Sequence, residues 1–131
     1  MTDSRKPIKC TFFAIPRGSV QQHILDIAIR ELRNHATEEM TIDDIVKRLP
    51  LSRNQLEHGM RKVLGRSPHE EVMRVRIETA CRLLRQTSLS MAEVAVHSGL
   101  GTVSNFCKVF KRRMGKSPRH FRIDQGVTHG Y

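Results

Sequence analysis

The sequence predicts an all-α fold of about seven helices, because apolar residues recur at helical spacing along most of the chain. In addition, Ser or Thr followed three residues later by Gln or Glu opens several of these stretches, which is the spacing of a capping box. The alternation of apolar and polar residues that is typical of strands is nearly absent. Its one candidate is the short segment 9–15, KCTFFAI.

Three helices are expected between residues 19 and 65. Ser19 and Gln22 have capping-box spacing and are expected to open the first helix, Thr41 a short second helix and Ser52 the third, with Gly65 beyond its end. The residues expected to face the core are Val20, Ile24, Ile27, Ala28 and Leu32 in the first helix, Ile42, Ile45, Val46 and Leu49 in the second, and Leu56, Met60, Val63 and Leu64 in the third.

Four more helices are expected after residue 66. Ser67 and Pro68 open a long helix that runs to residue 87, and Ser90, Thr102 and Ser117 open the fifth, sixth and seventh. The residues expected inward are Met73, Ile77, Ala80, Cys81 and Leu84 in the long helix, Phe106, Val109, Phe110 and Met114 in the sixth, and Phe121 in the seventh. Residues 1–18 are interpreted as an arm or as the junction to a sensor domain, 19–125 as the folded domain, and 126–131 as a tail.

Two stretches of the chain match at an offset of about fifty residues, and both end in Gly, a basic residue, Ser and Pro, at 65–68 and at 115–118. Each copy predicts a short helix, a tight turn and a longer helix, at about 41–65 and 90–115, which is the helix-turn-helix plan. Ala95 and Gly99 supply the small residues that a close meeting of two helices needs. The linker helix, 68–87, would span about 30 Å. It could therefore hold two recognition helices in successive major grooves, about 34 Å apart.

The charge of the chain also favours nucleic acid as its partner. The chain carries a net charge of +10, which suggests a polyanion, either nucleic acid or a membrane surface. Residues 51–67 hold four basic groups and one acidic group, and residues 90–125 hold seven and two. These blocks coincide with the two predicted units. No apolar run is long enough to span a bilayer, so no membrane partner is expected.

Catalytic and metal chemistry find no support in the sequence. The three cysteines, Cys10, Cys81 and Cys107, have neither disulfide-framework nor zinc-site spacing. No nucleophile–base pair and no phosphate-binding glycine loop is present. The sequence therefore predicts no enzyme, no cofactor and no metal, and a reducing cytoplasm as the compartment.

A family resemblance becomes specific in the second unit. The positions that carry it are Gly99-Leu100, Ser104, Phe106, Lys108, Phe110-Lys111-Arg112, Gly115, Ser117-Pro118 and Phe121-Arg122 in the second unit, and Leu51-Ser52, Leu56, Met60-Arg61, Gly65, Arg76, Ala80 and Leu83-Leu84 in the first. These residues resemble the signature of the AraC/XylS family of bacterial transcription regulators. The resemblance covers roughly residues 20–122. Leu100, Met60 and Asn105 depart from the residues usual in the family.

The resemblance implies a sequence-specific regulator of double-stranded DNA at the bacterial nucleoid, acting as an activator that also binds RNA polymerase. The segments 50–57 and 65–71 look closest to xylose-operon activators. In those a sensor domain precedes the DNA-binding domain, so an inducer such as a sugar is expected only if that domain exists. A small stand-alone stress or resistance regulator is the alternative within the family. In a different class, the chain could be the DNA-targeting module of a repair enzyme.

The resemblance also implies which side chains meet DNA. The residues expected to read bases are Asn54, Glu57, His58, Val103, Ser104, Asn105 and Lys108. Those expected to contact phosphates are Arg53, Arg61, Lys62, Ser67, Lys111, Arg112, Lys116 and Ser117. The acidic residues Glu38, Glu39, Asp43 and Asp44 are a candidate surface for a protein partner, although a solvated helix start explains them equally well.

Overall fold

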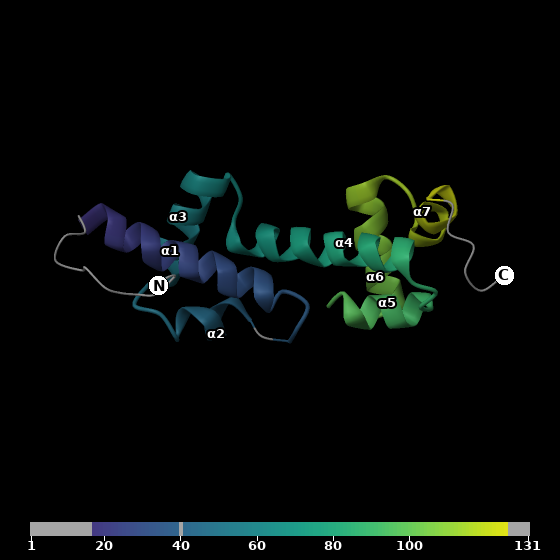
Figure 1. The fold of residues 1–131 in the computed structure, drawn as a ribbon, viewed down its shortest axis with the longest axis horizontal. Coiled ribbons are helices and arrows are strands. Elements are labelled where there is room, and N and C mark those ends of the chain that lie inside the picture. The colour runs from purple at the N-terminus through teal and green to yellow at the C-terminus, as the bar shows by residue number, and fades with distance from the viewer. Residues whose placement is uncertain (1–16, 40, 126–131) are drawn as a thin grey trace.

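The computed structural model describes residues 17–39 and 41–125, and the regular secondary structure there is all helical. In this part of the chain seven helices follow one another (Figure 1): α1 (Arg17–Asn34), α2 (Ile42–Val46), α3 (Arg53–Leu64), α4 (Pro68–Gln86), α5 (Met91–His97), α6 (Val103–Met114) and α7 (Pro118–Asp124). The all-α prediction is therefore confirmed for the described residues. The strand expected at 9–15 and the tail at 126–131 lie outside them.

Side-chain caps begin six of the helices where the sequence placed them, by satisfying backbone N–H groups that have no partner within the helix. Complete capping boxes form at Thr41, Ser52, Ser67 and Ser90. Thr102 and Ser117 accept a bond from the third residue of their helices. The first helix differs, because α1 already begins at Arg17 and Ser19 lies inside it. The amide of Gln22 donates to Asp26 one turn ahead, at 3.1 Å.

The first three helices and the start of α4 share one apolar core. Its buried residues are Leu25, Ala28, Ile29, Leu32, Ala36, Ile45, Leu56, Met60 and Val72. The apolar stripe expected on α1 was partly wrong, since Leu25 and Ile29 are buried whereas Ile24 and Ile27 are half-exposed. Both sets fit helical spacing, so packing against α3 and α4 decides between them. Val63, expected inward, is 48% exposed.

The last three helices and the second half of α4 enclose a second core. Phe106, Phe110 and Phe121 stack edge to face, with ring centroids 5.7 and 5.4 Å apart. The guanidinium of the buried Arg122 donates to the carbonyl oxygens of Leu84 and Thr87, which ties α7 to the end of α4. Met114, expected inward, is instead 38% exposed.

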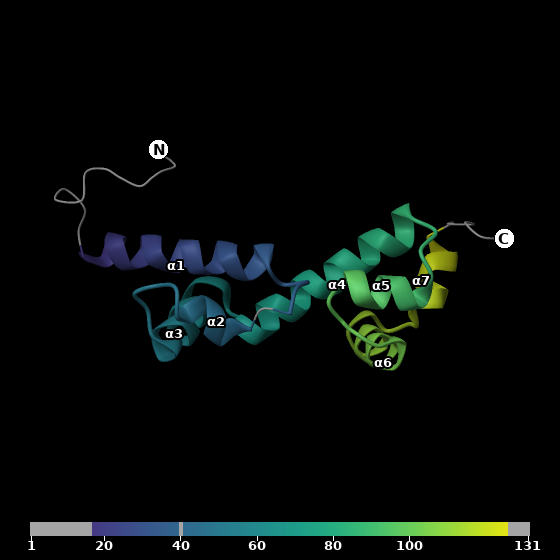
Figure 2. The same cartoon turned by 90° about the horizontal axis from the view of Figure 1, so that it is seen from below.

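Helix α4 joins the two halves as a continuous rod. Its 19 residues span about 28 Å at 1.5 Å per residue. Figures 1 and 2 show the molecule as two lobes on this rod, α1–α3 at one end and α5–α7 at the other. In the second view α3 and α6 both lie toward the same side of the molecule. The predicted arrangement of two helical units on a linker helix is therefore the observed one.

Candidate nucleic-acid interface

The second unit has a tight helix-turn-helix geometry between α5 and α6. Ala95 is fully buried at their junction, and its carbonyl oxygen accepts bonds from the N–H groups of Leu100 and Gly101, both at 2.9 Å. Gly99 has a φ of +84°, a left-handed conformation that favours glycine. The predicted role of Ala95 is thus supported. The small size of Gly99 serves another neighbour, since its close contact is Thr37, in the turn after α1.

On α6, the residues expected to read bases share an exposed face. Val103, Ser104, Asn105 and Lys108 are all exposed, while Phe106 and Phe110 are fully buried on the opposite side. Asn105 also has an internal role, because its Nδ2 donates to the carbonyl oxygen of Leu100 at 2.8 Å. One N–H and Oδ1 of that amide remain for a base.

On α3, two of the residues expected to contact DNA form ion pairs within the protein. Asn54 and His58 are exposed, but Glu57 is half-buried and pairs with Arg53 at 3.6 Å. Arg53 donates in turn to Asp43 of α2 at 2.6 Å. Arg53 therefore links the two helices of the first unit. Its contact with a phosphate stays a prediction, and that contact would compete with these carboxylates.

Basic side chains gather at the C-terminal ends of α3 and α6. Arg61, Lys62, Lys111 and Arg112, all expected at phosphates, are exposed there. Sequence reasoning missed Arg113 in the same last turn of α6. The N–H of Ser67 donates to the Glu70 carboxylate and lowers its pKa below the ordinary value, and the charges of Arg61 and Arg113 lower it further. The last turns of α3 and α6 therefore each carry a cluster of exposed basic side chains.

The other residues expected to contact phosphates differ in how far they already interact with groups of the protein itself. Lys116 pairs with Asp124 at 2.6 Å. The Ser67 N–H already donates to Glu70 within its capping box, at 2.7 Å. The start of α7 has no such box: the Ser117 hydroxyl caps His120, and the first turn carries no acidic residue. Of the two helix N-termini, that of α7 is therefore better suited to an anion.

The candidate acidic surface is largely used inside the domain. Glu38 lies 2.9 Å from the His35 ring, and Asp43 pairs with Arg53. Asp44 completes the α2 capping box, and the N–H and hydroxyl of Thr41 lower the pKa of its carboxyl. The start of α2 therefore accounts for Asp44, and side-chain contacts within the domain account for Glu38 and Asp43.

Within residues 17–39 and 41–125, no group of three or more His, Cys, Asp or Glu side chains is arranged to hold a metal ion. Among the helices described, none has the length and apolar character to cross a membrane.

Sequence comparison places the chain among regulators. The profile of the family described as a helix-turn-helix domain matches residues 45–123. The transcriptional regulator MtrA of Neisseria gonorrhoeae is 33% identical over 98 residues, which cover 75% of this chain and 33% of that protein. The xylose operon regulatory protein of Escherichia coli K12 is 28% identical over 95 residues, 72% of this chain and 24% of that protein. The chain thus spans a third or less of these curated relatives, and identity does not single out the xylose type.

Solved structures have the same arrangement of helices. The DNA-binding domain of AdpA, solved in complex with a target DNA, superposes with a TM-score of 0.71 at 25% identity, covering 76% of this chain and 90% of that chain. The xylose-binding transcription activator xylR superposes with a TM-score of 0.70 at 26% identity, covering 78% of this chain and 27% of that chain.

Proposed function

Since the chain belongs to the AraC-type helix-turn-helix family of DNA-binding transcription regulators, we propose that one molecule of it binds double-stranded DNA with α3 and α6 in successive major grooves. The observation that carries this proposal is the pair of helix-turn-helix units held by α4, with both second helices toward the same side (Figure 2). The α4 rod, about 28 Å long, is close to the spacing of about 34 Å between grooves on one face of B-DNA.

The exposed residues supply suitable chemistry for that role. Lys108 can reach guanine O6 and N7, Asn54 can pair with adenine, and Val103 can contact a thymine methyl group. Arg61, Lys62, Lys111 and Arg112, on the last turns of α3 and α6, are suited to phosphates, which fix register without reading sequence. Arg113 joins this group because it is exposed in the same last turn of α6.

We propose further that the protein activates transcription in the bacterial cytoplasm and contacts RNA polymerase. An inducer is expected if the chain is part of a longer protein with a sensor domain. Support comes from the description of the similar xylR as a xylose-binding transcription activator. A stand-alone regulator without inducer is the alternative. A full-length gene that encodes several hundred residues before residue 1, with sugar-dependent binding of its product, would favour the sensor form.

The two-groove proposal is tested with duplexes selected by the protein from random DNA. The selected site should contain two half-sites about 10 base pairs apart, and inserting 5 base pairs between them should weaken binding by at least about 100-fold. If the protein neutralises about 6–8 phosphates, log K should fall against log salt with a slope of about −5 to −7. Equal affinity for a duplex with one half-site, or a slope near zero, would contradict the proposal.

A further inference from the structure

The two apolar cores share no residue, although both use α4. Val72 and Val75 pack into the N-terminal core, whereas Ile77 and Ala80 pack into the C-terminal core. Arg76 lies between them on α4. Apart from α4 itself, the position of one unit relative to the other therefore depends on contacts made across this boundary.

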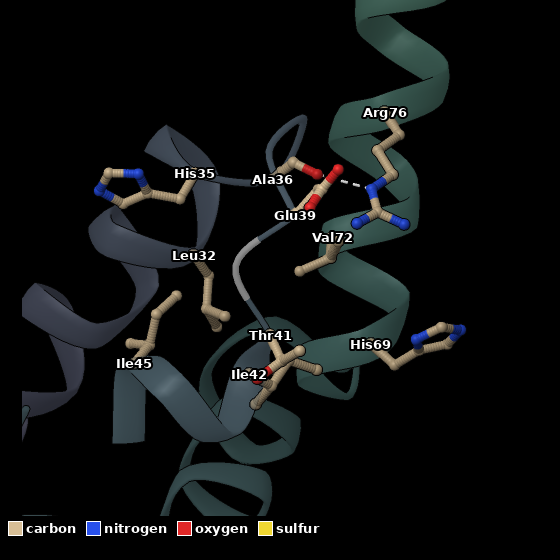
Figure 3. A pocket seen from close by; sticks show the side chains of 10 residues that line it. All are labelled: Leu32, His35, Ala36, Glu39, Thr41, Ile42, Ile45, His69, Val72 and Arg76. Atoms are coloured by element: carbon tan, nitrogen blue, oxygen red, sulfur yellow. Dashed lines mark hydrogen bonds between the residues drawn. The ribbon is translucent and has the colours of Figure 1, made fainter. Parts of the chain in front are cut away.

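The turn that follows α1 reaches Arg76 from the N-terminal unit. The Arg76 Nε donates to the carbonyl oxygen of Ala36 at 2.6 Å (Figure 3), across 40 residues of sequence. Burial lowers the pKa of Arg76 below its ordinary value, but a guanidinium remains charged near neutral pH. A charged donor makes a stronger bond than a neutral one. A cavity of about 220 Å³ lies beside this bond, between the turn, α2 and α4.

The next residue of the same turn meets the C-terminal unit. A Cβ atom on Gly99 would lie 2.8 Å from the Thr37 Cα, 3.0 Å from the Thr37 carbonyl oxygen and 3.1 Å from the Arg76 Nε. The first of these distances is shorter than side chains tolerate, and it is to backbone, which cannot swing aside. The backbone of the turn between α5 and α6 therefore lies directly against the backbone of the turn after α1.

We propose that Arg76 and Gly99, with the turn at Ala36 and Thr37, form a brace that fixes the spacing and angle between α3 and α6. The brace thereby sets how many base pairs separate the two half-sites. This inference rests on the proposed function, since spacing matters only if both helices enter DNA. Arg76 and Gly99 are positioning residues: they select DNA without touching it.

The turn between α5 and α6 offers a matched control. Gly101 has a φ of +86°, close to the +84° of Gly99, but no atom lies within 4 Å of where its Cβ would be. Gly99→Ala and Gly101→Ala therefore carry the same left-handed strain, and only the first pushes against Thr37. A second way to open the brace is Arg76→Met, which keeps the apolar stem and removes the donor to Ala36.

The first experiment measures residual dipolar couplings of the free protein by NMR. Wild type and Gly101→Ala should fit one alignment tensor for both units. Gly99→Ala and Arg76→Met should need two tensors, while couplings within each unit still fit the wild-type fold. The brace is overturned if both variants, folded, keep one tensor and the wild-type angle between the units. If Gly99→Ala does not fold, the couplings measured on Arg76→Met alone test the brace.

The second experiment measures affinity for duplexes whose half-site spacing is changed by −1, +1 or +2 base pairs. Wild type and Gly101→Ala should lose about tenfold in affinity or more with each change. Gly99→Ala and Arg76→Met should bind the native spacing about tenfold more weakly and vary less than about threefold across the series. Profiles parallel to wild type would overturn the brace. If wild type does not prefer duplexes with two half-sites, the proposed function is contradicted instead. The NMR experiment would then still test whether the brace fixes the angle between the two units.

Discussion

The carboxylate of Glu71 accepts a hydrogen bond from the Nε of Arg33 at 2.6 Å, which joins α1 to the first turn of α4. The Glu71 side chain is fully buried and also accepts from Arg66 at 2.8 Å and from Arg74 at 2.9 Å. The three arginine side chains keep 35–42% of their surface exposed. One buried negative charge thus holds α1, α4 and the turn between α3 and α4 together, and its partners keep part of their hydration.

Removal of that charge should destabilise the domain. Glu71→Gln keeps the size of the side chain but removes the carboxylate that Arg33 and Arg66 pair with, and leaves Arg74 paired with Glu78. The free energy of unfolding should therefore fall by about 3 kcal/mol, the low end for a broken buried ion pair. Glu78→Gln is the control, because that side chain is 70% exposed and, among the residues that the structure describes, pairs with Arg74 alone; its cost should stay below about 1 kcal/mol. Urea denaturation measures both, and equal costs would show that burial of Glu71 is unimportant.

Because the pKa of Glu71 differs between the folded and unfolded states, the stability of the domain should depend on pH in the acid range. The hydrogen bonds from Arg74, Arg33 and Arg66 lower the pKa of Glu71 from 4.5 to about 2. Between these values the unfolded chain binds more protons at this site than the folded protein. The stabilisation is therefore complete above the unfolded pKa and is lost as the pH falls through 4.5 toward 2. Urea denaturation across this range should show a steeper loss for wild type than for Glu71→Gln, and parallel curves would contradict the assignment.

Packing at the second helix-turn-helix predicts a size limit at position 95. Ala95 is fully buried between α5 and α6, so Ala95→Leu should overpack the junction and cost about 1–3 kcal/mol of stability. Ala92→Leu adds the same side chain to an exposed position of the same helix and should cost much less. Thermal melting compares them, and indistinguishable melting temperatures would show that the junction tolerates a larger side chain.

Base reading and phosphate binding should separate along α6. Lys108→Ala and Asn105→Ala should cost about 1–3 kcal/mol on the preferred site and less on others, whereas Lys111→Ala should weaken all sequences about equally and reduce the salt slope by about one. Binding selection on randomised duplex gives the preferred motif of each variant. An unchanged motif for the first two, or a changed one for Lys111→Ala, would reverse the assignment.

Asn105 needs one further control in that experiment. Its amide also holds the Leu100 carbonyl oxygen, so Asn105→Ala should lower the melting temperature as well as alter the motif. Lys108 has no such internal bond among those of the described residues, and Lys108→Ala should leave the melting temperature near that of wild type. Loss of stability without any change of motif would make Asn105 a structural residue of the turn.

The sequence alone was sufficient to predict the helices, the caps of all but the first helix, the two units and the family. A cap such as Ser52 depends on a partner three residues away, and a helix stripe repeats within two turns, so local spacing carries both signals. The exposed face of α6 could be predicted for the same reason. Local spacing could not choose between Ile24 and Leu25 on α1, because both fit the period and only packing distinguishes them.

The tertiary structure decided which charged and small residues meet across the chain. Glu71 lies in a segment of nearly balanced charge, and its partner Arg33 is 38 residues away. Arg53 pairs with Asp43 because the fold places α2 beside the start of α3, and nothing in the sequence indicates this pairing. Gly99 fits a tight turn in the sequence, but its approach to Thr37 exists only because α4 brings the two units together. Such contacts depend on the path of the whole backbone, which the spacing of neighbouring residues does not record.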